Sequence, residues 1–340
     1  MNMENPLNIE LSPKLKLIKS YREALNDIPA KQIHLVINDL DDCLYHRGEP
    51  PDDLPDTPET VMKKVRAYGR LMKSISKQTG LTFPQAIVTG RTAPALFDKP
   101  ALKEFLQIHS VINQGKHRLV TLPMPIIYAE LGAVQLINTD FGWQSQITPF
   151  FADYCQTIRP ELESWLYENY IQSGDFHFEE GAQVTLSLQY AGKGQFDKAI
   201  VANEIKTRWV KEGLVNFRNQ VEILTEGADL DLLPKSLFRG GKIHGIYAAT
   251  QFFRKLKRSL PLDHVVLMDD SGEKVSRWAI MENFQLALPE NARKKMKLVV
   301  GATENGAIGK YAGFWGVMDA LHQIFLGTNI PDSWIQYNHF

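Results

Sequence analysis

Cysteine is scarce in this chain, and its scarcity excludes two kinds of framework. Only two cysteines, Cys43 and Cys155, occur among 340 residues. They supply neither a disulfide scaffold nor the closely spaced thiols of a structural metal site. The nine histidines show no HxxxH or HExxH spacing, which argues against a zinc site. A reducing compartment is compatible with this composition.

Long apolar runs are also missing. No stretch of about 18 apolar residues, the length that predicts a transmembrane helix, occurs in the chain. The segment from Met1 to Lys14 has no apolar centre of the kind that signal peptides carry. The sequence therefore predicts a soluble, cytoplasmic protein without a transmembrane segment, although export by a route without a signal peptide would leave no trace in it.

Neither sign of charge predominates. The formal net charge is −1, which gives no electrostatic reason to expect a nucleic acid as partner. Apolar residues make up 44% and charged residues 23%, as in ordinary soluble globular proteins. A chain of 340 residues is long enough for one elaborate domain or two.

What the chain does contain is a strand-like apolar run that ends in carboxylates. Leu35 to Asn38 is followed by Asp39, Asp41 and Asp42. A run that is apolar on both faces predicts a buried strand of a parallel sheet, and open α/β sheets build their sites at the carboxyl ends of such strands. Like charges gathered there are costly without a cation, and hard oxygen donors suggest Mg²⁺. On this stretch alone, a strand followed by a plain acidic turn remains open.

Three further segments end or begin with groups that suit a phosphate or a metal. A predicted strand over 86–88 ends in Thr89-Gly90-Arg91, whose hydroxyl and bare backbone N–H can bind an anion. Lys242 opens a predicted helix, and a predicted strand over 264–268 ends in the acidic run from Asp269 to Glu273. Mg²⁺ and a lysine around a phosphate, with a carboxylate facing phosphorus, make a phosphoryl-transfer site.

Hydrophobic periodicity predicts the remaining elements. Further core strands are predicted over 126–129 and 298–300, and further helices over 58–79 with Thr57 as N-cap, over 150–170, over 197–212 and over 316–326. Between them, 184–189 alternates like a half-exposed antiparallel strand, and 221–224 with 230–233 predicts a hairpin. A helix, a strand, a helix and a hairpin set between core strands predict an inserted α+β module.

In order and spacing these motifs resemble the haloacid dehalogenase (HAD) superfamily, within its Cof-type and sugar-phosphatase branch. The family's strand-DxDxT motif is matched by Asp39-Leu40-Asp41-Asp42-Cys43, and strand-TGR by Thr89-Gly90-Arg91. The lysine that opens a helix is matched by Lys242, and strand-GDxxxD by Met268-Asp269-Asp270-Ser271-Gly272-Glu273. A weaker likeness to the family's ENGA run lies at Glu130-Leu131-Gly132-Ala133. Cys43 and Met268 stand where the family has Thr and Gly.

The resemblance implies a fold and a division into parts. We expect a doubly wound α/β core with a mainly parallel sheet and an inserted α+β cap of the C2 type. Residues 31–141 and 234–330 would form the core and 142–233 the cap, with a helical extension over 1–30 and a tail over 331–340. A cap of this kind closes over the site and reads the substrate.

The resemblance also implies a mechanism, that of a Mg²⁺-dependent phosphomonoesterase with an aspartyl-phosphate intermediate. Asp39 would be the nucleophile, and Asp41 would protonate the leaving group and then activate water. Thr89, the Gly90 N–H and Lys242 would bind the phosphoryl oxygens.

The metal site and the substrate follow from the same resemblance. The expected Mg²⁺ ligands are Asp39, the backbone carbonyl of Asp41 and Asp269, assisted by Asp270 or Glu273. The favoured substrate is a small phosphorylated metabolite such as a sugar phosphate. Three alternatives remain open: a phosphatase of phosphotyrosine proteins or phosphoinositides, a phosphomutase that requires a bisphosphate activator, and a non-catalytic binding protein that keeps the fold.

Overall fold

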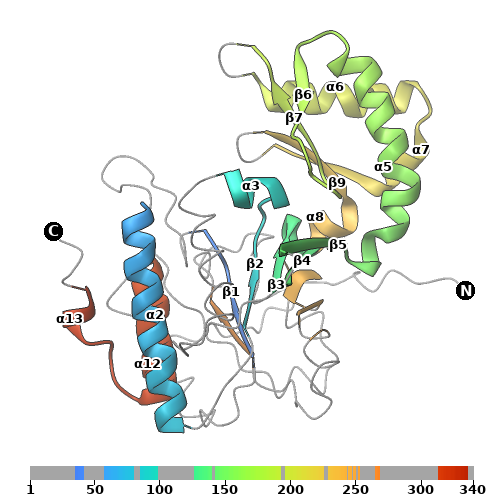
Figure 1. Ribbon diagram of the computed structural model, residues 1–340. Coiled ribbons are helices and arrows are strands. Elements are labelled where there is room, and N and C mark those ends of the chain that lie inside the picture. The colour runs from blue at the N-terminus through green and yellow to red at the C-terminus, as the bar shows by residue number, and fades with distance from the viewer. Residues whose placement is uncertain are drawn as a thin grey trace, which may run out of the picture.

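The computed structural model of the protein forms a mixed α/β fold around two sheets (Figure 1). It describes residues 35–41, 57–79, 85–98, 126–139, 142–192, 196–225, 229–242, 244–246, 248–249, 252, 265–268 and 313–335. The α/β class predicted from the sequence is confirmed. The predicted extension over 1–30, the acidic run from Asp269 to Glu273 and the strand over 298–300 lie outside the described residues.

The larger sheet has six strands in the order β10-β1-β2-β3-β4-β5. The pairs β10/β1, β1/β2 and β2/β3 are parallel, and the pairs β3/β4 and β4/β5 are antiparallel. The strands are β10 (Val265–Met268), β1 (Leu35–Asn38), β2 (Gln85–Val88), β3 (Ile126–Ala129), β4 (Val134–Thr139) and β5 (Gly142–Ile147). The predicted mainly parallel sheet is confirmed, and so are its strands at 35–38, 86–88, 126–129 and 264–268.

Described residues pack against both faces of this sheet. On one face α2 (Pro58–Thr79) and α12 (Gly313–Leu326) pack together and share a buried cluster with Val36 and Ile87. On the other face the backbone of Gly245 lies against the Val88 side chain. The predicted helices over 58–79 and 316–326 are confirmed, and α12 begins three residues earlier than predicted.

Two threonines fix the start of α2. The Thr57 N–H donates to Thr60 Oγ1 at 2.7 Å, and the Thr60 N–H donates to Thr57 Oγ1 at 3.3 Å. This reciprocal pair works as a capping box does, because it satisfies backbone donors that have no partner within the helix. The predicted role of Thr57 as N-cap is confirmed.

The smaller sheet has four antiparallel strands in the order β6-β7-β9-β8. They are β6 (Phe176–Phe178), β7 (Leu186–Tyr190), β9 (Leu230–Pro234) and β8 (Val221–Leu224). The predicted hairpin is confirmed as β8 and β9. The half-exposed strand predicted over 184–189 is antiparallel as expected, but its expected exposure is wrong, since Leu186, Ser187 and Leu188 are all buried. The hydroxyl of Ser187 donates to Asp231 of β9, which offsets the cost of burying this polar side chain.

Helices cover one face of the smaller sheet. They are α5 (Ala152–Leu166), its continuation η4 (Tyr167–Ile171), α6 (Lys198–Lys211) and α7 (Val215–Gln220), and Figure 1 shows α5 and α7 on the side remote from β1. Tyr154, Ile158 and Leu162 form the buried stripe of α5. Asp197 caps α6, accepting from the N–H groups of residues 199 and 200. The helices predicted over 150–170 and 197–212 are confirmed.

The two sheets are joined by a buried carboxylate. Glu130, Leu131 and Gly132 form η2 (Glu130–Gly132) after β3, and all three have positive φ. Glu130 is 1% exposed and accepts hydrogen bonds from the N–H groups of Gln183, Val184 and Thr185 at 2.8 to 2.9 Å, and from Thr185 Oγ1 at 3.0 Å. The carboxylate therefore satisfies the backbone of the chain that enters β7.

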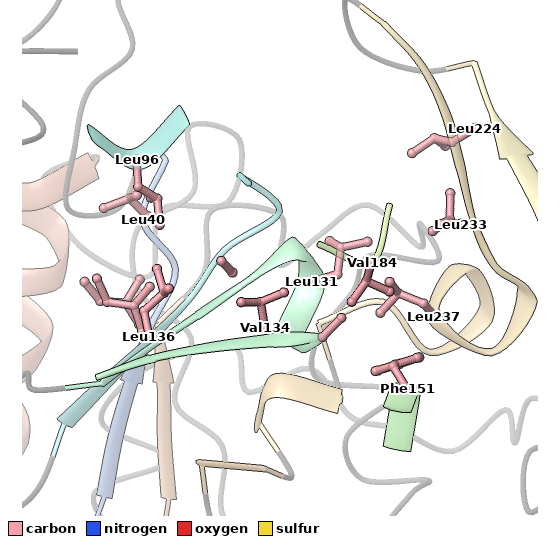
Figure 2. Close-up of a cluster of buried hydrophobic side chains, with 14 of the residues drawn as sticks. Leu40, Leu96, Leu131, Val134, Leu136, Phe151, Val184, Leu224, Leu233 and Leu237 are labelled. Carbon is pink, nitrogen blue, oxygen red and sulfur yellow. The ribbon is translucent and has the colours of Figure 1, made fainter. Parts of the chain in front are cut away.

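Apolar side chains surround this joint. Leu131 and Val184 belong to the same buried cluster, which continues through Leu237 into the smaller sheet (Figure 2). Gly132 and Gly245 approach so closely that a Cβ on Gly132 would lie 2.0 Å from the Gly245 nitrogen. Only glycine fits at that contact.

The remaining elements are short. They are η3 (Pro149–Phe151), α3 (Ala93–Asp98), α8 (Lys235–Gly240) and α13 (Asp332–Ile335).

Asn38 of β1 is fully buried, and no described residue hydrogen-bonds to its side-chain amide. A buried polar group in that state costs stability, on the order of 1–3 kcal/mol. None of the described helices is both long and apolar enough to cross a membrane.

Candidate functional site

The parallel pairing of β1 and β2 brings their carboxyl ends to one sheet edge. Asn38, the last residue of β1, lies opposite Ile87 of β2. Asp39 and Thr89 follow their strands directly, so both residues begin the loops at that edge. The edge is the one at which parallel α/β sheets bind ligands.

Asp39 is buried and held by two donors. Its side chain is 5% exposed, Oδ1 accepts the Leu40 N–H at 2.7 Å, and Oδ2 accepts from Lys242 Nζ. The predicted nucleophile and the predicted phosphate-binding lysine are therefore in direct contact. A carboxylate this deeply buried requires such a partner, because an isolated charge there would be strongly destabilising.

Lys242 reaches Asp39 from the loop that follows α8. Gly241 ends α8 with a φ of 51°, a conformation that glycine adopts without a Cβ penalty. The carbonyl of Lys242 accepts the Ile246 N–H at 3.1 Å, so Lys242 begins the next helical turn as predicted. Its side chain is 13% exposed. The ammonium group is thus placed at the sheet edge with little access to solvent.

Thr89 is held by β3 and by the turn that follows it. Thr89 is fully buried, its N–H donates to the Tyr128 carbonyl at 2.9 Å, and its carbonyl accepts the Leu131 N–H at 2.9 Å. Gly90 is exposed, and a Cβ there would lie 3.3 Å from Leu131. In the turn that follows β2, the backbone of Thr89 is therefore held by hydrogen bonds, whereas Gly90 is exposed to solvent.

Asp41 lies on the same edge, paired with a residue that the sequence-based site omits. Arg91 donates to both carboxylate oxygens of Asp41, with Nε at 3.1 and 3.0 Å and Nη2 at 2.7 Å. The sequence signal was present, since Arg91 closes the Thr-Gly-Arg run. What the sequence did not reveal is that its guanidinium turns back to the β1 loop.

The donors expected for Mg²⁺ are only partly described. Asp39 and Asp41 bring hard carboxylate oxygens to one edge, which is the ligand chemistry that Mg²⁺ prefers. Asp269, Asp270 and Glu273 lie outside the described residues. Within the part of the chain that is described, no group of three metal-ligating side chains comes together.

His244 holds the turn after Lys242 in place. Its ring packs against Phe150 and Phe151, with centroids 4.9 and 5.1 Å apart, and its Nε2 lies 3.0 Å from the Ser236 carbonyl. Since a carbonyl only accepts, Nε2 carries the proton. Burial lowers the pKa of His244, so the neutral ring is favoured. The contacts of His244 are those of a structural residue.

Polar side chains gather on the face of the smaller sheet opposite the helices. Ser187 pairs with Asp231 across β7 and β9, and His177 pairs with Gln189 across β6 and β7. Residues opposite each other, and residues two apart along a strand, share a face. Near this face Thr92 Oγ1 donates to Glu179 Oε1 at 2.8 Å, which links the smaller sheet to the turn after β2.

Asp231 makes the stability of this face depend on pH. Burial raises the pKa of Asp231 to about 6, and the nearby carboxylates of Asp229 and Glu179 act in the same direction. Ser187 donates to Asp231 and Lys198 carries the opposing charge, and both lower the pKa. Because the folded state holds this proton more tightly than the unfolded chain does, the free energy of unfolding falls as pH rises from about 4 to about 6.

We expect Asp231→Asn to remove this dependence. The free energy of unfolding of the variant should rise relative to wild type by up to about 3 kcal/mol between pH 4 and pH 7, as measured by urea denaturation. Asp153→Asn, at an exposed position in the first turn of α5, is the matched control and should follow the wild-type profile. A constant difference between Asp231→Asn and wild type across this range would contradict the prediction.

Comparisons with known proteins give remote matches in structure only. No family model matches the sequence, and no curated protein matches it either. A crystal structure of trehalose-6-phosphate phosphatase from Aspergillus fumigatus is 15% identical, with 93% of this chain and 98% of that chain covered and a TM-score of 0.43. The trehalose-6-phosphate phosphatase C-terminal domain from C. albicans is 13% identical, with coverage of 91% and 97% and a TM-score of 0.47.

A third match is IMP-nucleotidase from Plasmodium falciparum. It is 12% identical, with 89% of this chain and 71% of that chain covered and a TM-score of 0.47. Identities and TM-scores at this level leave the chemistry of the present chain to be argued from its own residues.

Proposed function

We propose that the protein is a phosphomonoesterase of the HAD superfamily that acts through an aspartyl-phosphate. The observation that carries the proposal is the contact between Asp39 and Lys242 at the sheet edge that also bears Thr89 and Asp41. A buried carboxylate beside an ammonium group, with a strand-end hydroxyl close by, offers a nucleophile and an anion site together.

In the first half-reaction Asp39 attacks the phosphate ester. A carboxylate oxygen of Asp39 bonds to phosphorus, the bond from phosphorus to the ester oxygen breaks, and the electron pair goes to that oxygen. The leaving oxygen takes a proton from the carboxyl group of Asp41 and departs as an alcohol. Lys242, the hydroxyl of Thr89 and the N–H of Gly90 bind the phosphoryl oxygens as their charge develops.

In the second half-reaction water hydrolyses the aspartyl-phosphate. The Asp41 carboxylate takes a proton from water while the water oxygen bonds to phosphorus. The bond from phosphorus to Asp39 breaks and its electron pair returns to the carboxylate. Inorganic phosphate leaves, and a proton has passed through Asp41 in each half-reaction.

Mg²⁺ is the cofactor that the oxygen donors fit. Asp39, the backbone carbonyl of Asp41 and Asp269 would hold it, assisted by Asp270 or Glu273. When bound, the ion offsets the negative charge of the phosphate against that of the two aspartates.

The lobe around the smaller sheet is the proposed cap, of the C2 type. Its helix-free face carries hydrogen-bonding side chains, and the bond from Thr92 to Glu179 links it to the turn that follows β2. A lobe so placed next to a phosphate site limits the substrate to small molecules. The proposed substrate class is a small phosphorylated metabolite such as a sugar phosphate.

The test is phosphate release by the wild-type protein. We expect hydrolysis of para-nitrophenyl phosphate with Mg²⁺ and its loss with excess EDTA, restored when Mg²⁺ is returned in excess. A panel of sugar phosphates, phosphotyrosine peptides and phosphoinositides then identifies the substrate class. Turnover confined to the peptides or lipids would contradict the small-molecule proposal, and no turnover of any member would contradict the enzymatic one.

A further inference from the structure

Arg91 and Asp41 form the most complete ion pair at the sheet edge. The guanidinium directs Nε and Nη2 at the Asp41 carboxylate in three contacts of 2.7 to 3.1 Å, and both carboxylate oxygens accept. The side chains are 15% and 21% exposed, so the pair is largely shielded from water. A fork of this kind fixes the direction of a carboxylate as well as its distance.

The backbone of Arg91 is itself held at both ends. Its N–H donates to Thr89 Oγ1 at 3.2 Å, and its carbonyl accepts the Glu130 N–H at 2.8 Å. The next residue, Thr92, donates to Glu179 of the smaller lobe. The guanidinium therefore extends from a turn that is bound on three sides, and Asp41 is oriented from a rigid support.

We infer that Arg91 is a positioning residue for the hydrolysis half-reaction, an inference that rests on the proposed function. In this arrangement both oxygens of Asp41 accept hydrogen bonds, as the oxygens of an ionised carboxylate do. The ionised carboxylate is the form of the side chain that can take a proton from water. Arg91 holds that carboxylate in one direction while the water oxygen bonds to phosphorus and the Asp39–phosphorus bond breaks. Without the guanidinium the side chain rotates among several rotamers, and few of them face the water.

Para-nitrophenyl phosphate separates this half-reaction from the first. Para-nitrophenolate is a stable anion that departs without a proton, so formation of the phosphorylated protein needs no proton from the Asp41 side chain. The value of kcat/KM reports the steps up to that formation, whereas the decay of the phosphorylated protein reports hydrolysis alone.

The experiment follows the phosphorylated protein in wild type, Arg91→Ala and Arg91→Lys with Mg²⁺. After rapid mixing with para-nitrophenyl phosphate and removal of excess substrate, acid-quenched samples are analysed by mass spectrometry. We expect the phosphorylated form to decay about 100-fold more slowly in Arg91→Ala, with kcat/KM changed by less than about threefold. Arg91→Lys keeps the positive charge but replaces the fork with a single ammonium nitrogen, so its phosphorylated form should decay at an intermediate rate.

Two controls separate positioning from general damage. Arg218→Ala removes an arginine from an exposed position of α7 and should leave every rate unchanged. Urea denaturation of both Arg91 variants tests whether the fold persists, and Arg91→Lys serves if Arg91→Ala unfolds.

Each outcome separates the role of Arg91 from the proposed function. Decay at the wild-type rate in folded Arg91 variants, or a fall in kcat/KM equal to that in kcat, would overturn the role of Arg91 and leave the phosphatase proposal standing. A wild-type protein that hydrolyses no para-nitrophenyl phosphate and forms no phosphorylated species would overturn both.

Discussion

Asp39→Asn is expected to lower the rate of Mg²⁺-dependent phosphate release by about 10⁴-fold or more, the largest change we expect from a single substitution in this protein. The asparagine side chain has the same shape, but its amide oxygen is a poor nucleophile and cannot form the acyl phosphate. The amide oxygen can accept only one of the two hydrogen bonds that the Leu40 N–H and Lys242 Nζ give to the two carboxylate oxygens, and the NH₂ group then faces the other donor. Because the side chain keeps its volume and one of these bonds, we expect the fold to survive with lowered stability while the chemistry is lost.

The measurement is phosphate release from para-nitrophenyl phosphate by wild type and variant at the same protein concentration. Asp153→Asn makes the same chemical change at an exposed position of α5 and should retain the wild-type rate. Circular dichroism and urea denaturation establish that Asp39→Asn is folded. A folded Asp39→Asn protein within tenfold of the wild-type rate would rule out Asp39 as the nucleophile.

Glu130→Ala is expected to lower the free energy of unfolding by about 4 kcal/mol. The substitution leaves three backbone N–H groups and one hydroxyl of the segment before β7 without their acceptor, in a region where water has little access. It also removes a side chain that lies between the two sheets. The loss should be visible as an earlier midpoint in urea denaturation.

Glu130→Gln distinguishes hydrogen bonding from packing. Glutamine fills the same volume, but one acceptor oxygen becomes an NH₂ group that faces N–H donors, so we expect a loss of roughly 2 kcal/mol. Glu161→Ala, on the exposed face of α5, is the matched control and should change stability by less than about 0.5 kcal/mol. Equal stability of wild type and Glu130→Ala would show that the joint between the sheets does not depend on this carboxylate.

The strands that carry the site could be predicted because their sequence signals are local. Runs such as Leu35–Asn38 and Ile126–Ala129 place apolar side chains on both faces, as buried strands of a parallel sheet do. The first residues of α2 and α6 could be predicted for the same reason. The capping residues Thr57 and Asp197 each find their hydrogen-bond partners within three residues along the chain. The contact between Asp39 and Lys242 follows from topology once both are assigned to one sheet edge.

The parts that could not be predicted depend on partners far away in sequence. Glu130 lies in a short run that resembles a family motif, but its acceptor role depends on residues 183–185, which no local pattern connects to it. The polar Ser187 suggested an exposed strand because its partner, Asp231, belongs to another strand. The strand β5 contains Gln144, Ser145 and Gln146, which carry no apolar pattern, and residues 142–147 were therefore assigned to the inserted module although they pair with β4.

The pairing of β1 with β10 determines when the site can exist during synthesis. All four strands of the smaller sheet leave the ribosome before β10, so that lobe has its full set of strands while β1 still lacks one neighbour. Lys242 also follows the strands of that lobe in the chain, so Asp39 can pair with Lys242 only after all four of those strands have been synthesised. A nascent chain that stalls between β9 and β10 therefore carries every strand of the smaller sheet, while the larger sheet still lacks the strand that pairs with β1.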